Sequence, residues 1–261
     1  MGFTPSRFSA RTARQGVGVV AALGVAGLLV GGCASPKSEQ KSGKRPAGAP
    51  PAVVFPAEQL PATWSGTFPT SAGWSERWTL RLRPDSTYFL REDHVGHGEA
   101  ASDHAVDDIG RWEKATDGGP LQLRGARLRS IELEVRHSDT LRLPARDPTG
   151  PDGPRDLVRS ASKELLEPTL TLVGNFRYLA DAARFQDCTA GLNLPVLMEG
   201  DYVAAERAYG GASHEPAGPL LIEVEGRIVQ RPGPVGGPGD YLLIEKFVSA
   251  LPGDDCPSRV D

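Results

Sequence analysis

The chain has 261 residues, with 29 basic and 33 acidic side chains and a formal net charge of −4. Basic and acidic residues are interleaved without the basic stripe that phosphate backbones require, which excludes nucleic acid as a partner. The 31 glycines, the 23 prolines and the shortness of the strand-like runs favour an all-β fold.

The N-terminus has the layout of a secretory signal that ends at a cysteine. Residues 1–16 contain three arginines and no acidic residue, and residues 17–31 are almost all apolar or glycine. The small residues before Cys33 resemble a bacterial lipobox, so residues 1–32 are predicted to be a lipoprotein signal peptide. The alternative is a transmembrane anchor, for which this run is short, because a helix needs about 20 apolar residues to span a bilayer.

Acylation of Cys33 would place the folded part in the cell envelope, outside the cytoplasm. Two acyl chains hold a protein stably on a membrane, whereas one chain binds only marginally. Ala34 stands where an aspartate retains enteric lipoproteins at the inner membrane, so an outer-membrane location is expected. Residues 33–57 are rich in Ser, Lys, Gly and Pro, which predicts a disordered tether.

Residues 58–145 are predicted to form a small up-and-down β-barrel. Residues 78–82 alternate between apolar and polar, residues 84–86 signal a turn, and residues 87–90 read as the returning strand of a hairpin. Further strands are expected at residues 110–114, 121–123, 131–135 and 140–143. This meander order, without a helical period, is typical of an up-and-down barrel.

Residues 146–168 contain many helix- and strand-breaking residues and are predicted to be a linker. The second domain, residues 169–261, combines several alternating strands with one short helical segment at residues 201–209. Five strands and one short helix suit an OB-fold-like barrel. The predicted organisation is therefore two β modules behind a lipid anchor.

Cys188 and Cys256 are the two cysteines that remain beside Cys33. A single pair of cysteines in an oxidising compartment favours a disulfide between them. Two free buried thiols are the alternative. The spacing is too wide for a CxxC redox site.

Three histidines, His94, His97 and His104, lie close together in an acidic segment. Imidazole suits copper and zinc, and neighbouring carboxylates could complete a site. The segment also reads as an exposed loop between strands, in which case the histidines would be incidental. No resident cofactor is expected otherwise, and copper or zinc are the candidate ions.

No recognisable nucleophile, base and acid pattern is present, so the chain is not expected to be an enzyme. Trp78 and Trp112 occupy strand patterns and are expected in the core. Trp74 lies in a loop, and an exposed Trp74 at an open barrel mouth could bind a small ligand or a glycan. Ligand binding is therefore a third hypothesis for the function.

Four blocks of the second domain resemble the C-terminal OB domain of the NlpE family. These blocks cover residues 176–191, 202–212, 219–228 and 254–258, in the family's order. NlpE proteins are envelope lipoproteins linked to copper homeostasis, surface sensing and Cpx-type stress signalling. The resemblance implies an OB domain with a disulfide at Cys188 and Cys256.

The first domain resembles the family's N-terminal barrel in the motifs at residues 64–69, 78–88 and 110–112. The family usually carries a CxxC motif just after the proline that corresponds to Pro69. Here Thr70 and Gly73 stand at those positions, so the resemblance does not extend to thiol-based copper binding.

The resemblance implies a lipoprotein that acts by protein contacts in envelope stress, surface sensing or copper homeostasis. Its implied partner is an envelope protein such as a sensor kinase, beside the membrane that holds the acyl chains. The alternative is a metal-binding envelope protein that uses the loop of His94, His97 and His104.

Overall fold

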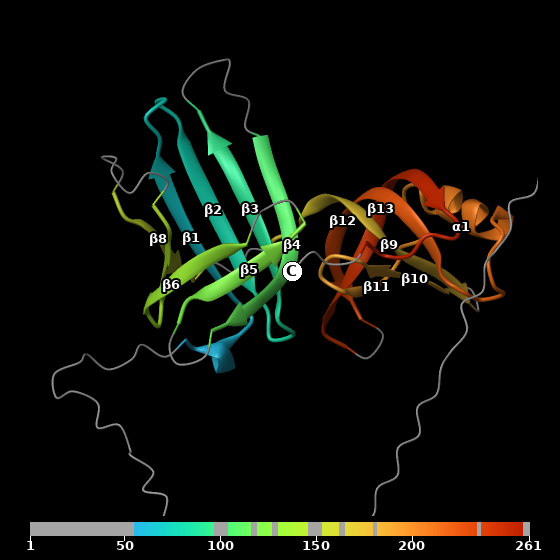
Figure 1. Ribbon diagram of the computed structural model, residues 1–261, viewed down its shortest axis with the longest axis horizontal. Coiled ribbons are helices and arrows are strands. Elements are labelled where there is room, and N and C mark those ends of the chain that lie inside the picture. Colours follow the sequence, from blue (N-terminus) through green and yellow to red (C-terminus); the bar gives the residue numbers. More distant parts are fainter. Residues whose placement is uncertain are drawn as a thin grey trace, which may run out of the picture. The chain divides into compact units, whose positions relative to one another are not determined.

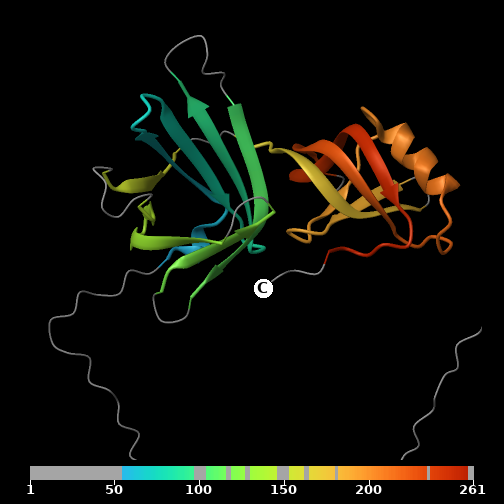
Figure 2. The ribbon, with the colours of Figure 1, turned by 45° about the horizontal axis from the view of Figure 1, so that its top comes forward.

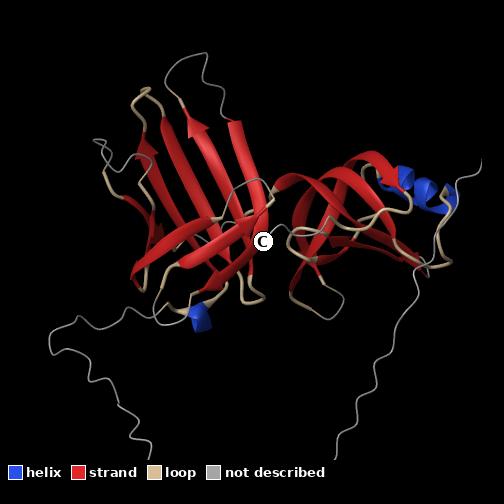
Figure 3. Ribbon diagram, in the orientation of Figure 1, coloured by secondary structure: helices blue, strands red, loops and turns tan. Residues whose placement is uncertain are grey.

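The fold is given by a computed structural model. The described residues are 55–96, 104–115, 119–126, 130–145, 153–161, 165–179, 182–233 and 236–257. Cys33, the predicted signal and most of the predicted tether lie outside these residues. Strands dominate the described chain, as Figure 3 shows, so the all-β prediction is confirmed.

The first part is a closed eight-stranded barrel in which strands that follow one another along the chain pair antiparallel (Figure 1). Its strands are β1 (Ala62–Pro69), β2 (Ser75–Leu82), β3 (Thr87–Val95), β4 (His104–Lys114), β5 (Leu121–Gly125), β6 (Ile131–His137), β7 (Thr140–Leu143) and β8 (Arg155–Arg159). Pairing of Trp64 with Arg159, and of Ser65 with Val158, joins β1 to β8 and closes the barrel. This is the predicted up-and-down topology.

Alternation along the strands explains why the barrel forms. In β2 every second residue is buried, and β1 and β5 follow similar patterns. Successive side chains of a strand point to opposite faces, so one set fills the barrel and the other faces outward. The barrel core consists of Phe55, Ala62, Trp64, Phe68, Trp78, Leu80, Leu82, Tyr88, Leu90, Leu121, Leu123, Leu133, Leu141, Leu143 and Leu157.

Two predicted boundaries of the barrel were wrong. The linker prediction for residues 146–168 overlooked β8, a five-residue strand that pairs with both β7 and β1. Prolines and glycines on its N-terminal side concealed it. The predicted tether also extended too far, because Phe55 is buried against Trp64 and Trp112, and η1 (Ala57–Gln59) follows it.

The acidic segment around His94 was interpreted as an exposed loop, and this was also wrong for much of it. Glu92, Asp93 and His94 belong to β3, while Asp107 and Asp108 are buried in β4. The segment's Gly and Asp content suggested a loop, but cross-strand pairing with β2 and β4 fixes it as sheet.

The second part is a five-stranded sheet in the order β11-β10-β9-β12-β13. Its strands are β9 (Thr169–Leu179), β10 (Ala182–Asp187), β11 (Asn193–Pro195), β12 (Leu220–Pro232) and β13 (Pro238–Leu251). A parallel bridge from Val196 to Leu242 brings the chain after β11 beside β13, so the sheet curls toward closure (Figure 2). The predicted OB-like architecture is confirmed.

Helix α1 (Tyr202–Gly211) lies between β11 and β12 in the chain and packs on the sheet. Tyr202, Ala205 and Tyr209 are its buried residues, at the spacing of one helical face. Asp201 begins the helix and ties it to β13, because its amide donates to Ile244 O and its carboxylate accepts from Phe247 N. These bonds fix the helix on one side of the sheet.

Side chains of β3 and β4 also contact residues near the start of β9. Asp107 accepts two hydrogen bonds from Arg91, and its Oδ2 also accepts the amide of Thr169 at 2.7 Å. Phe89 and Ile109 are buried in the same cluster as the core of the second sheet. The barrel surface at β3 and β4 is thus continuous with that core.

Within the described residues, no helix is long and apolar enough to cross a membrane.

Candidate functional site

Strand register gathers the candidate residues at one end of the barrel. Glu76 on β2 pairs with His94 on β3, and the backbone of His94 pairs in turn with that of His104 on β4. Phe68 on β1 pairs with Glu76. Directly paired residues project from the same face of a sheet, so Phe68, Glu76 and His94 share one face.

A buried ion pair joins β2 to β8 at this end of the barrel. Glu76 is 2 % exposed, and its Oε2 accepts a hydrogen bond from Arg155 Nη2 on β8 at 2.9 Å. The Arg155 guanidinium lies 5.0 Å from the ring centre of Phe68 and 5.5 Å from that of Trp78. A charge removed from water must be compensated, and here an opposite charge and two aromatic faces do so.

A carboxylate and an imidazole stand beside this pair. Glu92 Oε1 and His94 Nε2 lie 3.2 Å apart, and both side chains are only partly exposed. Trp74 covers the imidazole with its ring centre 4.8 Å from that of His94. Trp74 is itself held by a turn, because its carbonyl oxygen accepts bonds from the amide and the hydroxyl of Thr70.

The ligating atoms of Glu76, Glu92 and His94 all lie within 4.8 Å of one another. Two carboxylates and one imidazole are donors for borderline or hard divalent cations. Thiolate donors are not offered by the described residues, because Cys188 and Cys256 are joined in a disulfide. The described turn after Pro69 contains Thr70 and Gly73, with no thiol.

The structure treats each of the three predicted histidines differently. His94 lies in the cluster, His97 lies outside the described residues, and His104 is described only as a backbone position of β4. Sequence reasoning missed Glu76 and Arg155. Alternation along β2 marked Glu76 as an inward position, and an ionic residue at such a position was the available signal.

A second buried polar pair lies deeper in the barrel. The Tyr88 hydroxyl donates to Asp108 Oδ2 at 2.9 Å, and Asp108 Oδ1 accepts the amide of Ala126 at 3.1 Å. Burial first, then the charge and hydrogen bond of Asp108, raise the pKa of Tyr88 above its ordinary value. These contacts identify the pair as a structural element of the core.

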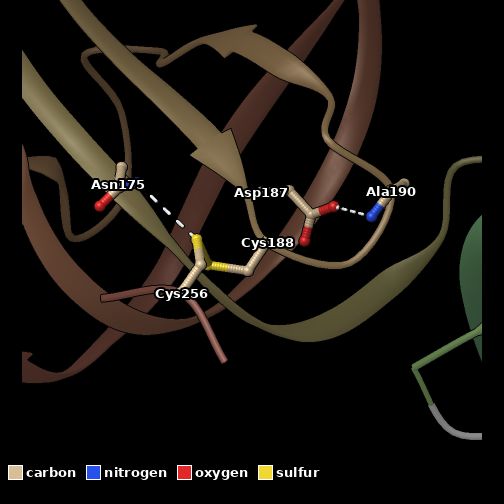
Figure 4. The surroundings of a disulfide bond; sticks show 5 residues. All are labelled: Asn175, Asp187, Cys188, Ala190 and Cys256. Carbon is tan, nitrogen blue, oxygen red and sulfur yellow. Dashed lines mark hydrogen bonds between the residues drawn. A yellow bond between two sulfur atoms is a disulfide. The ribbon is translucent and has the colours of Figure 1, made fainter. Parts of the chain in front are cut away.

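Cys188 and Cys256 form a disulfide that ties the C-terminal segment to the end of β10 (Figure 4). Asn175 on β9 donates to Cys256 Sγ at 3.7 Å. Asp187, next to Cys188, accepts the amide of Ala190 and holds the turn that leads toward β11. The disulfide and the Asn175 hydrogen bond therefore hold the C-terminal segment against β10 and β9.

Comparison with known proteins shows which proteins this chain is similar to. Residues 166–257 match the family model described as the NlpE C-terminal OB domain. The chain is also 27 % identical over 210 residues to the lipoprotein NlpE of Escherichia coli strain K12, covering 80 % of this chain and 86 % of that protein. Residues 166–257 therefore carry an NlpE-type C-terminal OB domain, and the chain as a whole is similar to the lipoprotein NlpE.

Among solved structures, the crystal structure of the Cpx pathway activator NlpE from Escherichia coli is similar. It matches 77 % of this chain and all of that chain at 26 % identity, with a TM-score of 0.33. The NlpE match begins at residue 166, inside the segment predicted as linker, where Leu166 is already part of the core. The match to the OB domain thus starts before the predicted position of residue 169.

Proposed function

We propose that the chain is an outer-membrane-anchored, NlpE-like lipoprotein that acts by protein contacts in envelope stress or surface sensing. The observation that carries this proposal is the likeness to the E. coli lipoprotein over 210 residues, together with the OB-domain match. Acylation of Cys33 would hold the protein at the membrane, and residues 34–54 would give it reach. A sensor kinase of the Cpx type is the proposed partner.

The second domain supplies a candidate contact surface. Met198 and Val203 are 65 % and 57 % exposed on either side of Asp201 at the start of α1. Asp201 bonds the amide of Phe247, whose neighbour Val248 is also exposed. Exposed apolar side chains can belong to protein contact sites, and we propose Met198 and Val203 as part of one.

A reporter assay tests the proposal. The chain would be produced in a Gram-negative host that lacks its own NlpE and carries a reporter of Cpx-type envelope stress. We expect the reporter to rise when the chain is overproduced, and to rise further when lipoprotein sorting to the outer membrane is blocked. A flat reporter, with the protein present in the membrane fraction, would contradict the signalling role.

Variants separate anchoring from contact. Cys33→Ala should release the protein from the membrane fraction and abolish the response. Met198→Asp combined with Val203→Asp should remove the response while the protein stays in the membrane. Val158→Asp is the matched control, because Val158 is 49 % exposed on the barrel and should leave the response unchanged.

A further inference from the structure

We propose that Glu76, Glu92 and His94 bind one divalent cation of the zinc(II) class at the end of the barrel. This proposal goes beyond the protein-contact function and does not rest on it. It also differs from a site made of the three histidines, because two of its three ligands are carboxylates on strands.

The strand register fixes the geometry of these ligands. Glu76 and His94 are direct partners across β2 and β3, and Glu92 precedes His94 by two residues, on the same face of β3. All three ligand atoms lie within 4.8 Å of one another. Sites built on strands hold their geometry better than sites on loops, so little ordering is needed when a cation binds.

The charges of the cluster favour a cation. Arg155 compensates Glu76 through the 2.9 Å hydrogen bond, whereas the described partner of Glu92 is the His94 imidazole. The cluster thus holds two carboxylates beside one imidazole, and Arg155 is paired with one of the two carboxylates. Like charges held close together in a partly enclosed site repel, and a bound cation relieves this repulsion. Trp74 and Trp78 reduce the access of water, which strengthens such an interaction.

The donor types set the selectivity. Imidazole nitrogen and carboxylate oxygen are established ligands of zinc(II), and they also suit copper(II). Copper(I) prefers thiolate or thioether ligands, which this cluster does not contain. We therefore expect zinc(II) and copper(II) to bind and copper(I) to bind at this site far more weakly.

Calorimetric titration with zinc(II) tests the site on the full-length chain, purified in detergent without a histidine tag. We expect one zinc(II) per chain for the wild type. His94→Ala and Glu92→Gln should each weaken binding at least about ten-fold, since even outer-shell changes at metal sites cost that much. Both residues are partly exposed, so these variants should fold, and circular dichroism would verify this.

The control is His137→Ala, which removes an exposed imidazole elsewhere on the barrel. Unchanged zinc(II) binding by this variant, with loss in the other two, supports the proposal. No stoichiometric binding by the wild type would overturn it. Binding that survives Glu92→Gln and is lost in a His97→Ala, His104→Ala double variant would also overturn it, in favour of a histidine site. None of these results bears on the reporter assay for protein contact.

Discussion

The carboxylate of Glu76 and the guanidinium of Arg155 meet inside the barrel at 2.9 Å, although 79 positions separate them in the chain. The pair joins β2 to β8, the strand that closes the barrel on β1. Because both side chains are buried, removing either one takes the opposite charge away from a group that is shielded from water. Variants of this pair therefore measure how much it contributes to the stability of this end of the barrel.

Replacing Glu76 alone should destabilise the protein strongly. We expect Glu76→Leu to lower the free energy of unfolding by about 3–5 kcal/mol, and the double variant with Arg155→Met to recover most of that loss. Urea denaturation followed by tryptophan fluorescence would measure both. Arg77→Ala, which breaks an exposed pair with Asp93, should cost less than about 1 kcal/mol. Equal losses in the single and double Glu76 variants would rule out the charge-pair explanation.

Tyr88→Phe should remove the hydroxyl that donates to the buried carboxylate of Asp108. Leaving this acceptor with one partner fewer should cost about 1–3 kcal/mol at pH 7. Tyr241→Phe, at a partly exposed position on β13, serves as the control. A stability equal to that of the control variant would show that the bond contributes nothing.

The pKa of Tyr88 is raised in the fold, which gives this residue an alkaline pH dependence. The contribution of the Tyr88 hydroxyl to the free energy of unfolding is fully present below the pKa of about 10 that tyrosine has in the unfolded chain. It decreases as pH rises above that value, because only the unfolded chain then releases the hydroxyl proton. The stability difference between wild type and Tyr88→Phe should therefore narrow between about pH 9 and pH 11. A difference that stays constant over this range would contradict the assignment.

A side chain at Gly125 would collide with the buried pair of Tyr88 and Asp108. A Cβ there would lie 2.0 Å from Asp108 Oδ2 and 2.2 Å from the Tyr88 hydroxyl. We expect Gly125→Ala to displace this pair and to lower the thermal midpoint. Gly210→Ala on α1 meets nothing within 4 Å and should instead raise stability by about 0.5–1 kcal/mol, because alanine is the better helix former. Differential scanning calorimetry compares the two.

Removing the disulfide should destabilise the second domain. Cys188 and Cys256 are 68 positions apart, and the chain-entropy model assigns about 4 kcal/mol to a loop of this length. The Cys188→Ala, Cys256→Ala double variant should show this loss in chemical denaturation. Adding dithiothreitol should reproduce it in the wild type and change nothing in the variant, which separates the bond from the substitutions.

Local sequence patterns were enough to predict the two β domains, but not the pairing of β8 with β1 that closes the barrel. Residues 78–82 alternate between apolar and polar and are followed by a turn, which predicted the hairpin of β2 and β3. This worked because the period of a strand can be seen in residues that are close in the sequence. The strand β8 has only five residues beside a breaker-rich segment, and its pairing with β1 depends on residues about 90 positions away.

The candidate site shows the same division. His94 was recognisable as a possible ligand by its residue type and neighbours. Its partner Glu76 was not, because their contact arises from the register of β2 against β3, which sequence spacing does not reveal. Arg155 was missed for a different reason, because it belongs to β8, which was interpreted as part of a linker.

The burial of Phe55 gives the proposed anchor a mechanical consequence. Tension on a membrane-held N-terminus would reach the fold at Phe55, whose ring is wedged beside Trp64 and Trp112, and would pass directly to β1. In the described residues that strand is joined to β8 by two residue pairs and a hydrogen bond from Ser160 N to Thr63 O, whereas β12 and β13 pair from Leu221 to Pro232. When force is applied at the N-terminus, we therefore expect the pairing between β1 and β8 to break first. The OB domain, which contains the disulfide, should stay folded.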